Sequence, residues 1–138
     1  NHLVACASGL SLTTALVASD DSLLLEPMEK DRAVRILSDL LLAWQTGMRQ
    51  PLPIAVKTAF AWLSQTDPLK AEAAARKAYE GDGQTNEGER RESPALSRQF
   101  ADFDALLADE TFSGWCDALY RPLLEAPWRS LSSEGARA

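Results

Sequence analysis

The sequence is poor in the residues that most often build metal and redox sites. It contains one histidine, His2, and two cysteines, Cys6 and Cys116, which are far apart and form no Cys-x-x-Cys motif. A zinc site would need nearly all of these ligands from distant positions, and a disulfide framework would use more cysteines at shorter spacing. We therefore expect no metal and no cofactor, and two buried free thiols in a reducing compartment.

Motifs for phosphate and acyl chemistry are also missing. No Gly-x-x-x-x-Gly-Lys loop and no Gly-x-Ser-x-Gly elbow occurs, and a histidine-based triad would depend entirely on His2. A restriction-like nuclease needs an acidic residue two positions before a lysine, to bind Mg²⁺ beside the attacking water. The residues two before the four lysines are Met28, Ala55, Pro68 and Ala75. The sequence therefore predicts no nuclease centre.

Carboxylates do occur in pairs, but their positions favour a structural role. The pairs are Asp20–Asp21, Asp102 with Asp104, and Asp109–Glu110. Each falls at a predicted turn or helix start, where short acidic side chains accept hydrogen bonds from free amides and oppose the helix dipole. We favour capping over acid–base catalysis and expect no catalytic residue.

The charge balance is acidic. Fourteen lysines and arginines stand against twenty acidic residues, giving a net charge of −6. A free-standing nucleic-acid-binding domain usually carries a positive field, so the balance argues against one. The charge balance does not exclude a domain that contacts DNA only as part of a larger assembly. The start of the chain lacks the basic region of a signal peptide, and apolar runs such as Leu40–Trp44 are too short to span a bilayer. We expect a cytoplasmic protein with no membrane contact.

With 138 residues, the chain has the length of one domain. We assign residues 1–128 to it, 82–92 to a mobile polar loop and 129–138 to a frayed tail. The sequence begins without methionine, in what resembles the last turns of a helix stopped by Gly9. We therefore expect a C-terminal fragment of a longer chain.

The fold class expected from the patterning is α+β and mainly α. Alternation over Leu10–Ala18 and the run Leu23–Leu25 before Pro27 predict a short β-hairpin near the N-terminus. About five helices follow, over residues 30–47, 56–63, 69–79, 93–100 and from 111, with a helical segment at 102–107. Gly47 is the predicted stop of the first of these, and Asp67–Pro68 and Ser93–Pro94 are predicted helix starts.

Apolar side chains at helical spacing predict the core. Val34, Leu37, Leu41 and Trp44 share one face of the helix over 30–47. Trp44, Trp62 and Trp115 lie on or beside such stripes, so we favour core anchoring over base stacking for all three. Trp128, which follows Pro127 near the end, is a candidate for contact with a partner.

Basic residues give the remaining site candidates. Arg76–Lys77 and Arg90–Arg91 are the densest basic sites, and acidic neighbours favour a solvated face over a phosphate patch. Arg49 lies in the connector Gly47–Pro53, which two prolines make rigid. The full set of interface or DNA-contact candidates is Arg49, Gln50, Lys57, Arg76, Lys77, Arg90, Arg91 and Trp128.

A family resemblance begins at the same connector. Gly47–Pro53, Lys57–Leu63, Ala75–Gly81, Glu92–Pro94 and Phe100–Leu106 occur in this order. The series resembles the C-terminal domain of the exodeoxyribonuclease V gamma chain, the RecC subunit of the RecBCD helicase–nuclease. Leu3–Gly9 and Leu12–Thr14 are similar to the entry of that domain. The resemblance extends over nearly the whole chain, to about Trp128.

The resemblance implies a non-catalytic role in DNA double-strand break repair and homologous recombination. The gamma chain holds the helicase–nuclease (beta) and helicase (alpha) subunits of an ATP-dependent complex together and helps to divide the duplex. Its C-terminal part is related in fold to restriction-like nucleases without their catalytic residues. For this chain the resemblance implies a scaffold that contacts these subunits, with contact to forked or single-stranded DNA left open. The alternative is an acidic helical protein-binding module that does not touch DNA.

Overall fold

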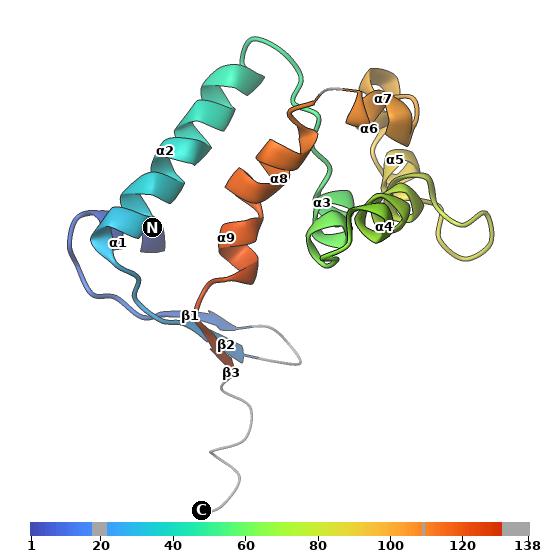
Figure 1. Cartoon of the computed structure of the whole chain (residues 1–138). Coiled ribbons are helices and arrows are strands. Elements are labelled where there is room, and N and C mark those ends of the chain that lie inside the picture. Colours follow the sequence, from blue (N-terminus) through green and yellow to red (C-terminus); the bar gives the residue numbers. More distant parts are fainter. Residues whose placement is uncertain (18–21, 109, 131–138) are drawn as a thin grey trace, which may run out of the picture.

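Short helices and one small sheet make up the computed structural model, which describes residues 1–17, 22–108 and 110–130 (Figure 1). The helices are α1 (His2–Ala7), α2 (Lys30–Gly47), α3 (Val56–Leu63), α4 (Pro68–Glu80), α5 (Glu89–Glu92), α6 (Pro94–Gln99), α7 (Phe103–Leu107), α8 (Phe112–Leu119) and α9 (Arg121–Leu124). The strands are β1 (Thr14–Val17), β2 (Ser22–Leu25) and β3 (Trp128–Ser130). The predicted mainly helical class with an N-terminal hairpin is confirmed. Eight helices follow the hairpin in the described residues, where the sequence predicted about five.

Most helix ends lie where the sequence placed them. The Asp67 carboxylate accepts hydrogen bonds from the amides of Leu69 and Lys70 at 2.9 and 3.1 Å, and Pro68 opens α4. Asp102 caps α7 in the same way, through the amide of Ala105. These caps satisfy amides that have no partner inside the helix. The two helices that the sequence did not predict, α5 and α9, begin without such a side-chain cap.

Gly47 does not act as the predicted stop. It is the last residue of α2 and lacks a positive φ, and the cap that follows it, Met48, has a right-handed backbone. The chain then turns through the two prolines of the connector. Gly9, by contrast, has a φ of +82° just after α1, as expected for the residue that ends a helix.

The sheet joins the two ends of the described chain. Its order is β1-β2-β3 and both pairings are antiparallel, with Leu24 of β2 opposite Ala15 on one side and Arg129 on the other. The sequence did not predict β3. Arg129 and Ser130, assigned to a frayed tail, belong to it, and an ion pair of 3.0 Å joins Arg129 to Glu26. Within the described residues the first strand covers 14–17 of the predicted 10–18, and residue 18 lies outside them.

The apolar core lies among α3, α4, α7 and α8 (Figure 1). Its buried members are Ala55, Ala59, Ala75, Tyr79, Phe103, Leu106, Phe112 and Cys116. The rings of Phe103 and Phe112 meet edge to face at 6.0 Å, and half-buried Trp62 packs on Phe112 at 5.4 Å. The Tyr79 hydroxyl donates to the carbonyl of Phe100 at 2.7 Å. This packing agrees with the predicted core role of Trp62.

The predicted core stripe of α2 is wrong for three of its four members, while the fourth, Leu37, is half-buried. Val34, Leu41 and Trp44 are exposed, and the buried residues of α2 are the small Ala33 and Ala43. α2 contacts α1 and α8, and small residues allow helices to approach closely. Because α2 carries apolar side chains on more than one face, their spacing alone could not select the face that turns inward.

The polar segment 82–92 is also more ordered at its end than predicted. Residues 89–92 form α5, and Glu89 is only 8% exposed. Its carboxylate accepts hydrogen bonds from the amides of Lys57 and Thr58 at 3.1 and 2.9 Å and from the Thr58 hydroxyl at 2.9 Å. The carboxylate therefore caps α3 from a distant part of the chain. The composition of the segment showed that it buries no apolar area. It did not show that a carboxylate of the segment is held by polar contacts.

Candidate interaction surfaces

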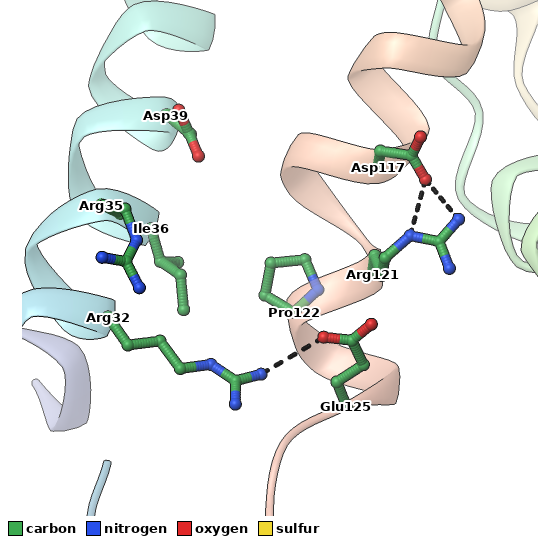
Figure 2. Close-up of a pocket in the computed structure, with 8 residues that line it drawn as sticks. All are labelled: Arg32, Arg35, Ile36, Asp39, Asp117, Arg121, Pro122 and Glu125. Carbon is green, nitrogen blue, oxygen red and sulfur yellow. Dashed lines mark hydrogen bonds and ion pairs between the residues drawn. The ribbon is translucent and has the colours of Figure 1, made fainter. Parts of the chain in front are cut away.

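A charged cleft of about 410 Å³ separates α2 from α8 and α9 (Figure 2). Arg32, Arg35 and Asp39 of α2 lie on one side. Arg35 and Asp39 follow Arg32 by three and seven residues, a spacing that places all three on the polar face of the helix. The opposite side consists of Asp117, Arg121, Pro122 and Glu125. Arg32 crosses the cleft to Glu125 at 3.4 Å, while Arg121 pairs with Asp117 one turn before it, at 2.5 Å.

The charges of this cleft are balanced. Three arginines face three carboxylates, so the cleft lacks the net positive field that a phosphate backbone requires. Arg35 and Asp39 make no side-chain hydrogen bond or ion pair within the described part of the chain. These two groups are therefore available to a protein surface that carries both signs of charge.

An apolar cavity of about 460 Å³ adjoins the charged cleft and shares Ile36 and Pro122 with it. Leu25 of β2, Leu40 of α2 and Trp128 of β3 are among the residues that line it. The indole Nε1 of Trp128 donates to the carbonyl of Leu123 at 2.9 Å, which fixes the ring in the wall of the cavity. Trp128, a predicted partner contact, thus lies in the wall of an apolar cavity, and its contact with a partner stays a prediction.

A row of large apolar side chains runs along the outside of α2. Val34, Leu41, Trp44 and Met48, here called the α2 row, are 43%, 59%, 63% and 72% exposed. Single exposed apolar residues are ordinary on a protein surface. Three of them on one helix, with Met48 at its C-terminal cap, form a patch of the kind that marks contact sites between proteins.

The predicted cation Arg76 is used inside the fold. Its guanidinium pairs with Glu72 at 3.2 Å and with Asp104 at 2.6 Å, and it lies 5.0 Å from the ring centre of Phe103. The hydrogen bond to Asp104 is the largest cause of the raised pKa of Arg76, and the same hydrogen bond lowers the pKa of Asp104. Arg76 therefore joins α4 to α7 over the core.

Three further cations also have partners in the chain. Lys57 binds Glu92 at 2.5 Å, Arg90 donates to the carbonyl of Ala101, and Lys77 lies 3.8 Å from Asp82. The pKa of Asp82 is lowered, chiefly because its carboxylate accepts hydrogen bonds from backbone amides, that of Asn86 first. Charges used in this way contribute little to a phosphate-binding patch.

Arg49, Gln50 and Arg91 are the exposed candidates whose side chains have no partner in the described residues. Arg49 and Gln50 follow the end of α2, and Arg91 lies in α5. The eight predicted candidates are thus distributed over several elements, and no single patch contains them all. Their function stays a prediction.

The two thiols occupy different surroundings. Burial is the main cause that raises the pKa of Cys116 to about 12, so this thiol stays protonated at neutral pH. Cys6 lies 3.7 Å from the Nε2 atom of His2, and the Nδ1 atom of His2 is 2.9 Å from the Thr14 hydroxyl. His2 therefore links α1 to β1. Residues 1–17, 22–108 and 110–130 contain no group of three potential metal ligands.

Within the described ranges, every helix is too short or too polar to cross a bilayer.

Sequence reasoning missed the cleft residues and Glu89. Arg32, Arg35 and Asp39 share one face at helical spacing, and Asp117 with Arg121 form an i,i+4 pair, so each half of the cleft is readable from the sequence. The approach of the two halves, which are 78 or more residues apart in the sequence, is not, because it depends on how α2 packs on α8. Glu89 lies in a polar run that carries no signal for burial.

Residues 1–67 match the family model of the RecC C-terminal domain. This segment belongs to that family, as the resemblance implied. It covers α1, β1, β2, α2 and α3 and ends at the cap of α4. No curated protein matches the chain.

Proposed function

We propose, from the membership of residues 1–67 in the RecC C-terminal domain family, that the chain is a non-catalytic scaffold domain of a RecBCD-type helicase–nuclease. Its partners are the helicase–nuclease (beta) and helicase (alpha) subunits, and it acts with them in the cytoplasm during double-strand break repair. The observation that carries the proposal is that the matched segment contains the α2 row, an apolar surface that the described chain leaves open.

The charge distribution supports protein contact as the main role. Arg32, Arg35 and Asp39 present both signs of charge beside an apolar cavity, and such mixtures are typical of protein interfaces. A scaffold needs surfaces of this kind and no reacting groups.

Contact with forked DNA is the finer part of the proposal. We assign it to Arg49 at the end of α2 and Arg91 of α5, because their side chains are exposed and without partners in the described residues. The alternative, a protein-binding module with no DNA contact, is favoured by the internal pairing of Arg76, Lys57, Lys77 and Arg90.

Reconstitution tests the scaffold role. The 138-residue chain is mixed with the purified beta and alpha subunits of its own complex, and assembly is measured by size-exclusion chromatography with light scattering. We expect the chain to elute with at least one subunit. Separate elution of the chain from both subunits would contradict the scaffold proposal.

The DNA part needs a separate measurement. Fluorescence anisotropy with labelled forked DNA at low salt is expected to show binding that weakens steeply as salt is added. Arg49→Ala should reduce this binding, or the assembly of the complex, without changing the melting temperature. Absence of binding by the wild-type chain selects the module that does not contact DNA.

A further inference from the structure

We propose that His2 and Cys6 of α1, together with Met28, form a binding site for a soft monovalent metal ion, and that Cu⁺ is the ion that this donor set fits best. The proposal goes beyond the scaffold function and does not depend on it. The three side chains come from α1 and from the segment that leads into α2, and α1 packs on α2. A bound ion would therefore join these two elements.

The two donor atoms of α1 lie at the separation that one metal ion requires. His2 and Cys6 are four residues apart and share one face of the helix. The Nε2 atom of His2 is 3.7 Å from the Sγ atom of Cys6. Metal bonds of about 2.0–2.1 Å to imidazole and about 2.3 Å to thiolate place two such atoms roughly 3.5–3.8 Å apart, for bond angles between tetrahedral and trigonal. The separation of the pair already fits one bound ion.

The other ring nitrogen of His2 is held by β1. Its Nδ1 atom is 2.9 Å from the Thr14 hydroxyl, and with the ring proton on Nδ1 it donates to that oxygen. This tautomer leaves the lone pair of Nε2 free and directed at Cys6, as a metal ligand requires. Histidines that bind metals commonly have such a partner on the second nitrogen, which fixes the ring. Thr14 is therefore a positioning residue of the site.

Met28 brings a third donor of the same chemical kind. It lines the apolar cavity, which His2 also lines, and a smaller cavity of about 140 Å³, which Cys6 lines. A residue that borders both cavities lies beside the His2–Cys6 pair. The smaller cavity also gives an ion a path to Cys6, which is otherwise buried.

The chemistry of these donors selects the ion. Thiolate and thioether sulfur favour Cu⁺, whereas Mg²⁺, Ca²⁺ and Mn²⁺ prefer oxygen ligands. Protein zinc sites use at least three nitrogen, thiolate or carboxylate ligands, and no three such side chains meet within residues 1–17, 22–108 and 110–130. Cu⁺ accepts a lower coordination number than zinc. When it binds, the Cys6 thiol loses its proton to the solvent and the S–Cu bond forms, so one proton is released for each ion.

Competition with bicinchoninate, a coloured Cu⁺ chelator, measures the affinity of the 138-residue chain in the absence of oxygen. We expect one Cu⁺ per wild-type chain and a higher melting temperature in its presence. Cys6→Ser should weaken the affinity at least about 100-fold. Cys116→Ser is the matched control, because it removes the other free thiol, and it should change the affinity less than about twofold. Circular dichroism checks that each variant is folded.

The positioning role of Thr14 has its own measurement. Thr14→Val should weaken the affinity about tenfold without changing the stoichiometry, because the ring of His2 is then no longer held in place. Thr14→Ser restores the hydroxyl and should restore the affinity. Equal affinities for Thr14→Val and the wild type would overturn this role.

X-ray absorption at the copper edge identifies the ligands in the wild-type chain, so it decides the question even if Cys6→Ser does not fold. One nitrogen and two sulfur neighbours are expected. Met28→Leu should remove one sulfur neighbour, and Met48→Leu, which changes the other methionine, should remove none. Two sulfur neighbours that persist in Met28→Leu overturn the assignment of Met28.

Three results would overturn the site as a whole. The wild-type chain would take no Cu⁺ from the chelator, Cys6→Ser would bind as tightly as the wild type, or Cys116→Ser would abolish the binding. In each of these cases the contact between His2 and Cys6 is only a hydrogen bond within the fold.

Discussion

Residues 55–120 and residues 1–47 differ in whether their large apolar side chains are buried or exposed. In the first region Tyr79, Phe103 and Phe112 are completely buried and form one aromatic cluster with half-buried Trp62. In the second region the buried positions are His2, Cys6, Ala33 and Ala43, while large apolar side chains along α2 and β1 face outward. Both regions contain many apolar residues, so the two regions differ in the size of the side chains that they bury.

The comparison shows which region buries its own large side chains. Burial of large side chains is the main source of folding free energy, so residues 55–120 hold most of the stabilising contacts. Residues 1–47 leave much of their apolar area exposed in the described chain. The family match covers this second region and only the beginning of the first.

The largest effect is expected in the aromatic cluster. Phe103→Ala should lower the free energy of unfolding by about 3–5 kcal/mol, because the ring is fully buried between Tyr79 and Phe112. Urea unfolding followed by circular dichroism measures the change. Leu16→Ala of β1 is the control and should cost less than about 1 kcal/mol, since Leu16 is 56% exposed. Equal costs for the two variants would remove the contrast between the regions.

A smaller effect is expected where a carboxylate ties α5 to α3. Glu89→Gln keeps the size of the side chain but weakens three hydrogen bonds to Lys57 and Thr58, which should cost about 1–3 kcal/mol. Glu92→Gln removes an exposed ion pair with Lys57 and should cost at most about 1 kcal/mol. Urea unfolding of both variants at pH 7 decides the order. If Glu92→Gln lowers the free energy of unfolding more than Glu89→Gln does, the buried Glu89 carboxylate is not the main contact that holds α5 on α3.

The ion pair between α4 and α7 gives a pH-dependent effect, smaller than that of the buried cap. The Arg76 guanidinium lowers the pKa of Asp104, so the folded state favours the carboxylate. The stabilisation from this carboxylate is complete at pH values above its pKa in the unfolded state, about 4. It is lost as the pH falls through the lower pKa that Asp104 has in the folded state. Asp104→Asn should therefore melt below the wild type at pH 7, and the two melting temperatures should converge in acid. A gap that stays constant from pH 7 to pH 3 would assign the effect to something other than this titration.

The smallest effect is expected on α2. Trp44→Ala should change the free energy of unfolding of the isolated chain by no more than about 0.5 kcal/mol, because the ring is 63% exposed. Trp62→Ala is the matched control and should cost about 3 kcal/mol, since Trp62 packs on Phe112. Guanidinium unfolding followed by far-ultraviolet circular dichroism compares them. A large cost for Trp44→Ala would mean that residues 1–47 bury this ring in solution.

Local signals in the sequence were sufficient for most helices, though not for the short α5 and α9. Asp67 followed by Pro68 starts α4, and Asp102 starts α7, because a cap and the amides it binds lie within one turn of each other. The hairpin is similarly local. The strand β3 was missed because its three residues pair with β2 about a hundred positions away, and so short a segment has no periodicity of its own.

The candidate surfaces were predicted less well, for a related reason. Periodicity shows that Val34, Leu41 and Trp44 share a face of α2, but it does not show whether that face meets this chain or another one. Charge clusters such as Arg76–Lys77 look alike in sequence whether or not partners surround them. The Arg76 partner Asp104 is 28 residues away, and only the packing of α7 on α4 brings it near.

The segment between α4 and α5 has a narrow neck. Gly81 and Gly88 approach so closely that a Cβ on either would collide with the backbone of the other side, whereas a Cβ on Gly83 would meet open space. Residues inserted beside Gly83 would therefore be separated from Glu89, the residue that caps α3, by the close approach of Gly81 and Gly88. This makes the tip near Gly83 a place to attach a fluorophore or an affinity tag without a backbone collision.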